Sequence, residues 1–215
     1  MQEKTDERVT NNYQDVIIAW EERATTWNYE EKYVALGLEG YTSEAKLPIV
    51  FYGKKYWINR CDGTIREAWG DERKVTFATA ISIYSLFFHS VQHPYTKGVW
   101  IPFREVKRAG GFAAAFIKTI LEPFAKAFDG KKEKLLEAGE GLGFVKINDS
   151  EVGFEAKAFS CIPIRFLFWD GDDEFPAQTN ILFDAEITQY VHEETVVLLA
   201  SEGVQRLMDY DSSIT

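Results

Sequence analysis

The chain has 215 residues, of which 46% are hydrophobic, with 16 Phe, 10 Tyr and 6 Trp, and a formal net charge of −10. A chain of this size can bury roughly 70% of its unfolded surface, so this composition excludes a largely disordered protein. Its two cysteines exclude a disulfide framework. Because the sequence has no apolar run of about 20 residues and no apolar leader, we expect a cytoplasmic protein without a membrane span.

The first third of the chain predicts helices and then short strands. Residues 1–10 are strongly charged and predict a mobile tail, followed by a single α+β domain over residues 11–210. Helices are expected over 11–24, with Tyr13, Ile17 and Trp20 on one face, and over 28–36. Three β-type runs then predict an antiparallel meander over about 47–69, with a tight turn at Asp62-Gly63.

Helical periodicity returns in the middle of the chain. The expected helices cover 72–91, 110–128 and 131–143, with a short extended piece at 98–105. His93-Pro94 marks the end of the first of these helices. Pro123 lies inside the second, where its missing N–H predicts a kink or the start of a new helix.

The last third is rich in β-branched and aromatic residues. Strands are expected over 152–159, 162–169 and 180–184, and helices over 185–191 and 192–210. Arg165 interrupts an otherwise apolar strand and requires either a partner or access to water. The predicted fold class is therefore α+β, a small antiparallel meander and a C-terminal antiparallel hairpin packed with several amphipathic helices.

The most distinctive local feature is an acidic loop between two apolar strands. It reads Trp169-Asp170-Gly171-Asp172-Asp173-Glu174-Phe175-Pro176, which gives four carboxylates in five positions. The acids do not follow the spacing of the twelve-residue calcium loop. Three interpretations remain open, namely a solvated turn or structural ion pair, a contact with a partner, and a Ca²⁺, Mg²⁺ or Mn²⁺ site.

Two further residues are candidates beside this loop. Asp184 closes the last predicted strand and either caps the following helix or acts with the acidic loop. Arg104, next to Trp100 and Phe103, is either an anion-binding fork or an ordinary solvated strand residue. The candidate binding residues are Arg104, Trp169, Asp170, Asp172, Glu174, Phe175 and Asp184.

The charge distribution bears on the partner. Nine acids and no Lys or Arg lie between Asp170 and Gln205, a balance that repels nucleic acid and attracts a basic partner or a hard cation. Solubility of an aromatic-rich chain explains the same acids equally well.

Other catalytic patterns are weak in this sequence. His89, His93 and His192 predict surface or capping roles, and Cys61 and Cys161 predict inert thiols. The sequence contains neither a nucleophile-elbow GxSxG motif nor a phosphate-binding glycine loop. No cofactor is therefore expected.

Three successive motifs carry a family resemblance, namely GVWIPFREV, the GGFAAAF helix and IPIRFLFWDGDDEFPAQTNILFD. In these motifs the sequence resembles a prokaryotic family of unknown function found largely in anaerobes. The resemblance covers roughly residues 11–205. Some family members carry an appended iron–sulfur-binding segment and are associated with corrinoid proteins, which implies a corrinoid or iron–sulfur protein as partner. The family-like positions are Trp100, Phe103, Arg104, Trp169, Gly171, Asp172, Glu174, Phe175, Pro176 and Asp184.

Two main hypotheses follow from the sequence. The first is a non-enzymatic binding or accessory domain that uses the acidic loop and its flanking aromatic residues. The second is a metal-dependent hydrolase in which the acidic loop and Asp184 hold a cation and Arg104 neutralises an anionic substrate. A sensor of small molecules with an aromatic pocket is a third possibility.

Overall fold

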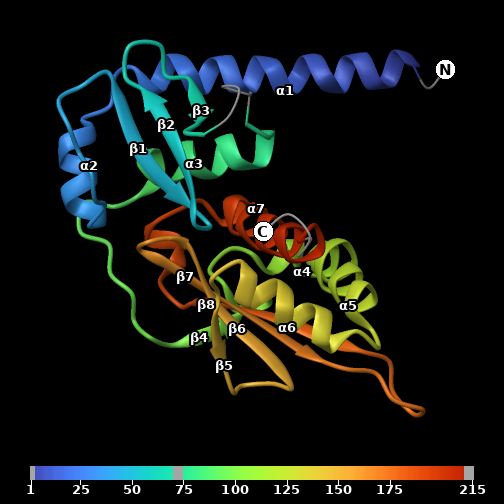
Figure 1. The fold of residues 1–215 in the computed structure, drawn as a ribbon. Helices are drawn as coiled ribbons and strands as arrows, with labels where there is room; N and C mark the ends of the chain where they lie inside the picture. The colour runs from blue at the N-terminus through green and yellow to red at the C-terminus, as the bar shows by residue number, and fades with distance from the viewer. Residues whose placement is uncertain (1–2, 70–74, 211–215) are drawn as a thin grey trace.

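A computed structural model describes residues 3–69 and 75–210 of the chain (Figure 1). It has the predicted α+β fold, with two antiparallel sheets and surrounding helices. The helices are α1 (Glu3–Ala24), α2 (Tyr29–Leu36), α3 (Phe77–His89), α4 (Ala113–Phe116), α5 (Glu122–Phe128), α6 (Lys132–Gly141) and α7 (Glu193–Met208). The strands are β1 (Lys46–Phe51), β2 (Lys54–Asn59), β3 (Ile65–Glu67), β4 (Trp100–Pro102), β5 (Val145–Ile147), β6 (Val152–Phe159), β7 (Ile162–Trp169) and β8 (Gln178–Asp184).

Helix α1 is longer than the sequence predicted. It begins at Glu3, so most of the segment expected to be a tail is helical. The predicted apolar face of this helix packs on α3, because the Tyr13 ring lies 4.6 Å from that of Phe77 and Trp20 stacks on Tyr84 at 6.0 Å. Of the described helices, none combines the length and the apolar character needed to cross a bilayer.

The small sheet is the predicted meander, with strand order β1-β2-β3. Its second turn depends on Gly63, which has φ +74 and whose missing side chain leaves room for the backbone of Glu21 in α1. The Gly63 carbonyl accepts a hydrogen bond of 2.8 Å from the Tyr84 hydroxyl of α3. The turn therefore joins the meander to both helices.

The large sheet has the strand order β4-β8-β7-β6-β5 and extends the predicted hairpin by further strands on both sides. Arg165 in β7 finds charged partners, at 3.0 Å from Glu155 and 2.7 Å from Asp149, and its guanidinium lies 4.0 Å from the centre of the Trp100 ring. These contacts explain why an arginine is tolerated in an apolar strand.

Two helical predictions, the one at Pro123 and the one over 185–191, have different outcomes. Around Pro123, a π-helical turn, η3 (Ile117–Leu121), gives way to α5 at Glu122, so a new helical segment starts at the proline. The helix predicted over 185–191 is wrong, because only the 3₁₀ turn η4 (Ile187–Gln189) forms there. The Gln189 carbonyl instead accepts a hydrogen bond of 2.9 Å from the Val91 N–H.

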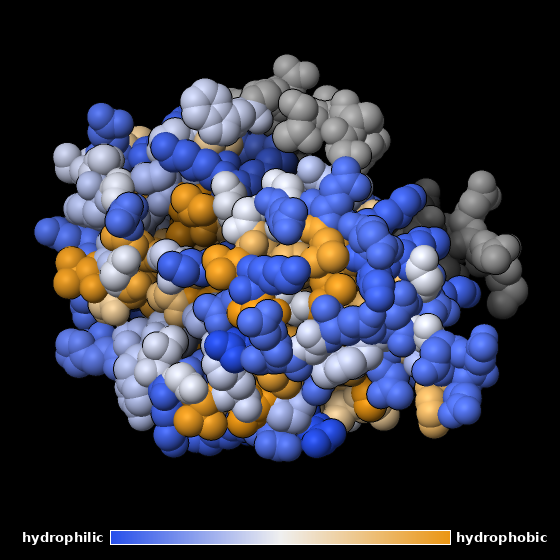
Figure 2. All heavy atoms as spheres, turned by 60° about the horizontal axis from the view of Figure 1, so that its bottom comes forward, coloured by the Kyte–Doolittle hydropathy of each residue, from blue (hydrophilic) through white to orange (hydrophobic). Residues whose placement is uncertain are grey.

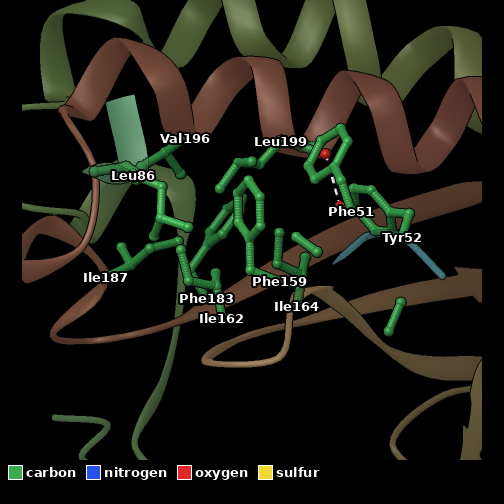
Figure 3. Packing of buried hydrophobic residues seen from close by; sticks show 14 of the residues in the cluster. Phe51, Tyr52, Leu86, Phe159, Ile162, Ile164, Phe183, Ile187, Val196 and Leu199 are labelled. Carbon is green, nitrogen blue, oxygen red and sulfur yellow. Dashed lines mark hydrogen bonds between the residues drawn. The ribbon is translucent and has the colours of Figure 1, made fainter. Parts of the chain in front are cut away.

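One buried hydrophobic cluster contains residues of both sheets and of α3 and α7 (Figure 3). At its edge lies the β1–β2 turn, where Tyr52 has φ 47 and is only 4% exposed. Its hydroxyl donates to the Leu199 carbonyl of α7 at 2.7 Å, and its N–H donates to the Ala158 carbonyl of β6 at 2.9 Å. This turn fixes the small sheet to the large sheet and to α7.

Candidate functional site

The acidic loop is the tip of the hairpin formed by β7 and β8, and we call residues 170–176 the acidic tip. In Figure 1 the orange β7–β8 hairpin projects from the body of the molecule. Trp169 and Gln178 are the last paired residues before the tip. Asp172, Asp173 and Glu174 are all exposed to solvent, as expected for carboxylates in a solvated turn.

Asp172 shapes the tip through its own backbone. Its Oδ1 atom accepts hydrogen bonds of 2.8 Å from the N–H groups of Glu174 and Phe175, and its N–H donates to the Phe175 carbonyl at 2.9 Å. The two N–H donors hold the pKa of the Asp172 carboxyl below its usual range. Asp172 is thus ionised at neutral pH and serves as a structural residue of the turn.

Asp170 anchors the base of the tip to the body of the protein. Its Oδ1 atom accepts hydrogen bonds from the N–H groups of Gly130 at 2.7 Å and Gly171 at 3.0 Å. Its own N–H donates to Glu151 at 3.0 Å, and Glu151 pairs with Lys132 at 2.6 Å. These contacts fix the start of the tip on the α5–α6 turn and on the β5–β6 turn.

The remaining groups of the tip are exposed to solvent. The carboxylates of Asp173 and Glu174 have no hydrogen-bond or ion-pair partner in the described part of the chain. Phe175 is 62% exposed and Trp169 is 38% exposed. Figure 2 shows hydrophobic residues in patches separated by hydrophilic ones on the face that it presents. The tip therefore offers two unpaired negative charges beside two exposed aromatic rings.

Asp184 is not part of the acidic tip. It is 3% exposed at the other end of β8, and a strand of this length spans roughly 20 Å. Its carboxylate accepts hydrogen bonds from the N–H groups of Lys97 (2.9 Å), Gly98 (2.7 Å) and Glu186 (2.9 Å). The bond to Glu186 is a local turn contact and not the predicted helix cap, because η4 begins after Glu186 and has no side-chain cap. The other two bonds tie β8 to a segment 87 and 86 residues earlier in the sequence.

Arg104 also lies apart from the candidate site. Its side chain is 72% exposed and pairs with the neighbouring Glu105 at 3.5 Å. The structure thus brings together Trp169, Asp170, Asp172, Glu174 and Phe175, but not Arg104 or Asp184. Among the residues that the structure describes, no group of three or more His, Cys, Asp or Glu side chains is arranged to hold a metal ion.

The described part of the chain contains hollows that were not foreseen from the sequence, and two of them lie beside α7. One, of about 520 Å³, lies among the meander, α3 and α7, and includes Arg206, whose guanidinium is 3.6 Å from Glu202. The other, of about 210 Å³, includes His89 and His192. Each is lined by segments distant in the sequence, so no local sequence pattern could have indicated it.

Comparison with known proteins gives a family but no characterised relative. Residues 30–206 match the model of a family described as "Domain of unknown function (DUF3786)". This range includes the acidic tip, Asp184 and most of α7. No curated protein and no solved structure matches the chain.

Proposed function

We propose a function for this chain, which belongs to the DUF3786 family, a family of domains of unknown function. The protein is a non-enzymatic binding domain, and its acidic tip holds a basic segment of a partner protein. The single observation that carries this proposal is the exposure of Asp173, Glu174 and Phe175 on a projecting hairpin whose shape is fixed by Asp170 and Asp172.

The chemistry of the tip specifies the kind of partner. Unpaired carboxylates attract Lys and Arg side chains and raise the rate of encounter with them. The exposed rings of Trp169 and Phe175 add a surface on which a guanidinium or ammonium group can lie. A fixed turn loses little conformational freedom on binding, which favours affinity. The partner is therefore a protein with a Lys- and Arg-rich segment.

The family resemblance gives a narrower partner class. It suggests a corrinoid or iron–sulfur protein, for which this domain acts as an accessory protein in the cytoplasm of an anaerobe. Recognition would require a basic surface on that protein, because the tip offers only negative charge and aromatic rings.

The alternative, a metal-dependent hydrolase, receives less support from the geometry. In that hypothesis Asp184 completes a cation site with the tip, and Arg104 faces the same site. Asp184 is buried at the opposite end of β8, and Arg104 pairs with Glu105. Carboxylates about 20 Å apart cannot bind one ion, because metal–oxygen distances are close to 2–2.6 Å.

A pair of matched double variants tests the proposal. Asp173→Asn with Glu174→Gln removes two charges from the tip and leaves the hydrogen bonds of Asp170 and Asp172 in place. Glu39→Gln with Glu44→Gln removes two charges from the exposed loop between α2 and β1, on the other side of the molecule in Figure 1. The probe is a fluorescent peptide of about ten residues that is rich in Lys and Arg. Its binding is measured by fluorescence anisotropy.

The tip variant is expected to bind the peptide roughly three- to tenfold more weakly, with the largest difference at low ionic strength. The control variant should bind like the natural protein. Equal weakening in both variants would contradict the proposal, because it would show that the peptide responds only to net charge. Unchanged binding by the tip variant would contradict it as well.

A further inference from the structure

Three segments distant in the sequence meet around the hollow of about 210 Å³. His89 is the last residue of α3, and His192 is the N-cap of α7. Lys107 and Arg108 come from the segment after the 3₁₀ turn η1 (Phe103–Glu105). Glu193, in the first turn of α7, is the only acid among the residues that line the hollow. We call His89, Lys107, Arg108 and His192 the basic hollow.

The two imidazoles of the basic hollow are neighbours, with ring centres 5.1 Å apart and ring planes tilted by 47°. His192 Nδ1 accepts a hydrogen bond from the Glu194 N–H at 3.3 Å, so its Nε2 atom carries the proton and remains available as a donor. Glu193 lies 3.5 Å from this Nε2 atom. His192 thus has one ring nitrogen used for capping and the other turned to a polar neighbour.

The charges around the hollow are unbalanced. Lys107 and Arg108 are exposed, and neither has an ion-pair partner within residues 3–69 and 75–210. The lining of the hollow therefore contains the positive charges of Lys107 and Arg108 and a single carboxylate, that of Glu193. The N-terminus of the 16-residue helix α7 adds partial positive charge to the same place. This local excess is notable because the whole chain has a net charge of −10.

We propose that the basic hollow binds a small oxyanion of the phosphate class, held by Arg108, Lys107 and the two imidazoles. A guanidinium, an ammonium and two imidazole N–H groups are the donors that proteins use for such anions. The hollow has room for about seven water molecules, at ~30 Å³ each, and so accepts a tetrahedral oxyanion with a small substituent.

Proton uptake should accompany binding of the anion. Burial lowers the pKa of His89, and the nearby charges of His192 and Lys32 lower it further, while Glu193 opposes them. His89 is therefore neutral at neutral pH when the hollow contains no anion. A bound dianion favours the protonated imidazole, so by reciprocity the anion binds more tightly as the pH falls.

Proton NMR of the histidines in the full-length protein provides the test. The chain has three histidines, and His93 is exposed and does not line the hollow, so its C2–H signal is an internal control. Sulfate is the first probe, because its charge is constant between about pH 5 and 8, where His titrates. Inorganic phosphate and acetate follow at matched ionic strength.

Sulfate and phosphate are expected to shift the His89 and His192 signals saturably at millimolar concentrations, to raise the titration midpoint of His89, and to leave His93 unchanged. Absence of a saturable shift at His89 and His192, or an equal shift of all three signals, would overturn the proposal. Acetate binding as tight as sulfate would overturn the assignment to the phosphate class.

Two variants sharpen the result. Arg108 has φ +67, so Arg108→Gly removes the guanidinium without straining the backbone, and sulfate affinity should fall about tenfold. Lys107→Gln should weaken sulfate binding several-fold, whereas Lys118→Gln, which removes an exposed charge on the η3 segment, should leave it unchanged. Equal effects of the two lysine variants would contradict a specific site.

Discussion

The two ends of strand β8 carry carboxylates in opposite environments. At its start, the acidic tip exposes Asp173 and Glu174 to water without a partner in the described structure. At its end, Asp184 is buried and accepts hydrogen bonds from three backbone N–H groups. The same chemical group is therefore a surface feature at one end of the strand and a structural joint at the other.

This contrast explains why the acids of the β8 hairpin should not be treated as one site. A buried carboxylate requires donors, and Asp184 obtains them from the loop that precedes β4. An exposed carboxylate needs none, so Asp173 and Glu174 are available for an external partner. Substitutions at the two ends should consequently affect different properties of the protein.

The largest effect is expected at Asp184. Asp184→Ala removes the acceptor of three partly buried hydrogen bonds, from the N–H groups of Lys97, Gly98 and Glu186. Each loss costs about 1 kcal/mol or more, so the free energy of unfolding should fall by roughly 3 kcal/mol. Urea unfolding followed by circular dichroism measures it. Asp184→Asn retains one acceptor oxygen and should cost less. A stability equal to that of the natural protein would show that the loop does not depend on Asp184.

An intermediate and purely local effect is expected at Asp172. Its pKa is lowered in the folded turn, so its contribution is fully present above the ordinary Asp pKa of about 3.9 and is lost as the pH falls through the folded value. As the pH falls through that folded value, the amide protons of Glu174 and Phe175 should lose their protection relative to unstructured amides, measured by hydrogen exchange in NMR. Asp172→Asn should remove this pH dependence. Acid-induced changes of the same size in that variant would contradict the assignment.

The smallest effect on stability is expected from the double substitution of Asp173→Asn and Glu174→Gln. Neither side chain has a partner in the described structure, so the urea midpoint should not change. Loss of basic-peptide binding at constant stability would separate recognition from folding. A marked fall in the urea midpoint would instead mean that these acids stabilise the fold, and the contrast between the two ends of β8 would fail.

Much of the fold follows from local patterns. The meander and the β7–β8 hairpin were predicted because their apolar and β-branched runs are bounded by glycines and acids. Helix α3 was predicted from the three-and-four spacing of its apolar residues, although it ends at His89 and its predicted residues 72–74 lie outside the described ranges. The exposure of the acidic tip to solvent also follows from its density of charged residues.

The remaining features depend on distant contacts. Strand β5 has three residues, too few to produce a pattern, and it pairs with the edge offered by β6. Strand β4 lies within the extended piece predicted over 98–105, but its pairing with β8 could not be predicted from so short a segment. The hypothesis that Asp184 acts with the tip is wrong, because the extended strand β8 separates the two by roughly 20 Å. His89 and His192 were each given a surface or capping role, and their proximity, with ring centres 5.1 Å apart, arises only from the fold.

The Tyr52 turn has a consequence for how the protein unfolds. Detaching the meander from the large sheet would expose the Tyr52 ring and break its bonds to Leu199 and Ala158. It would also separate the Phe51 ring from that of Phe159, which lies 4.9 Å away. Opening of the smaller sheet alone therefore costs nearly as much free energy as unfolding of the whole protein. The amide protons of both sheets should become accessible to solvent in one cooperative event.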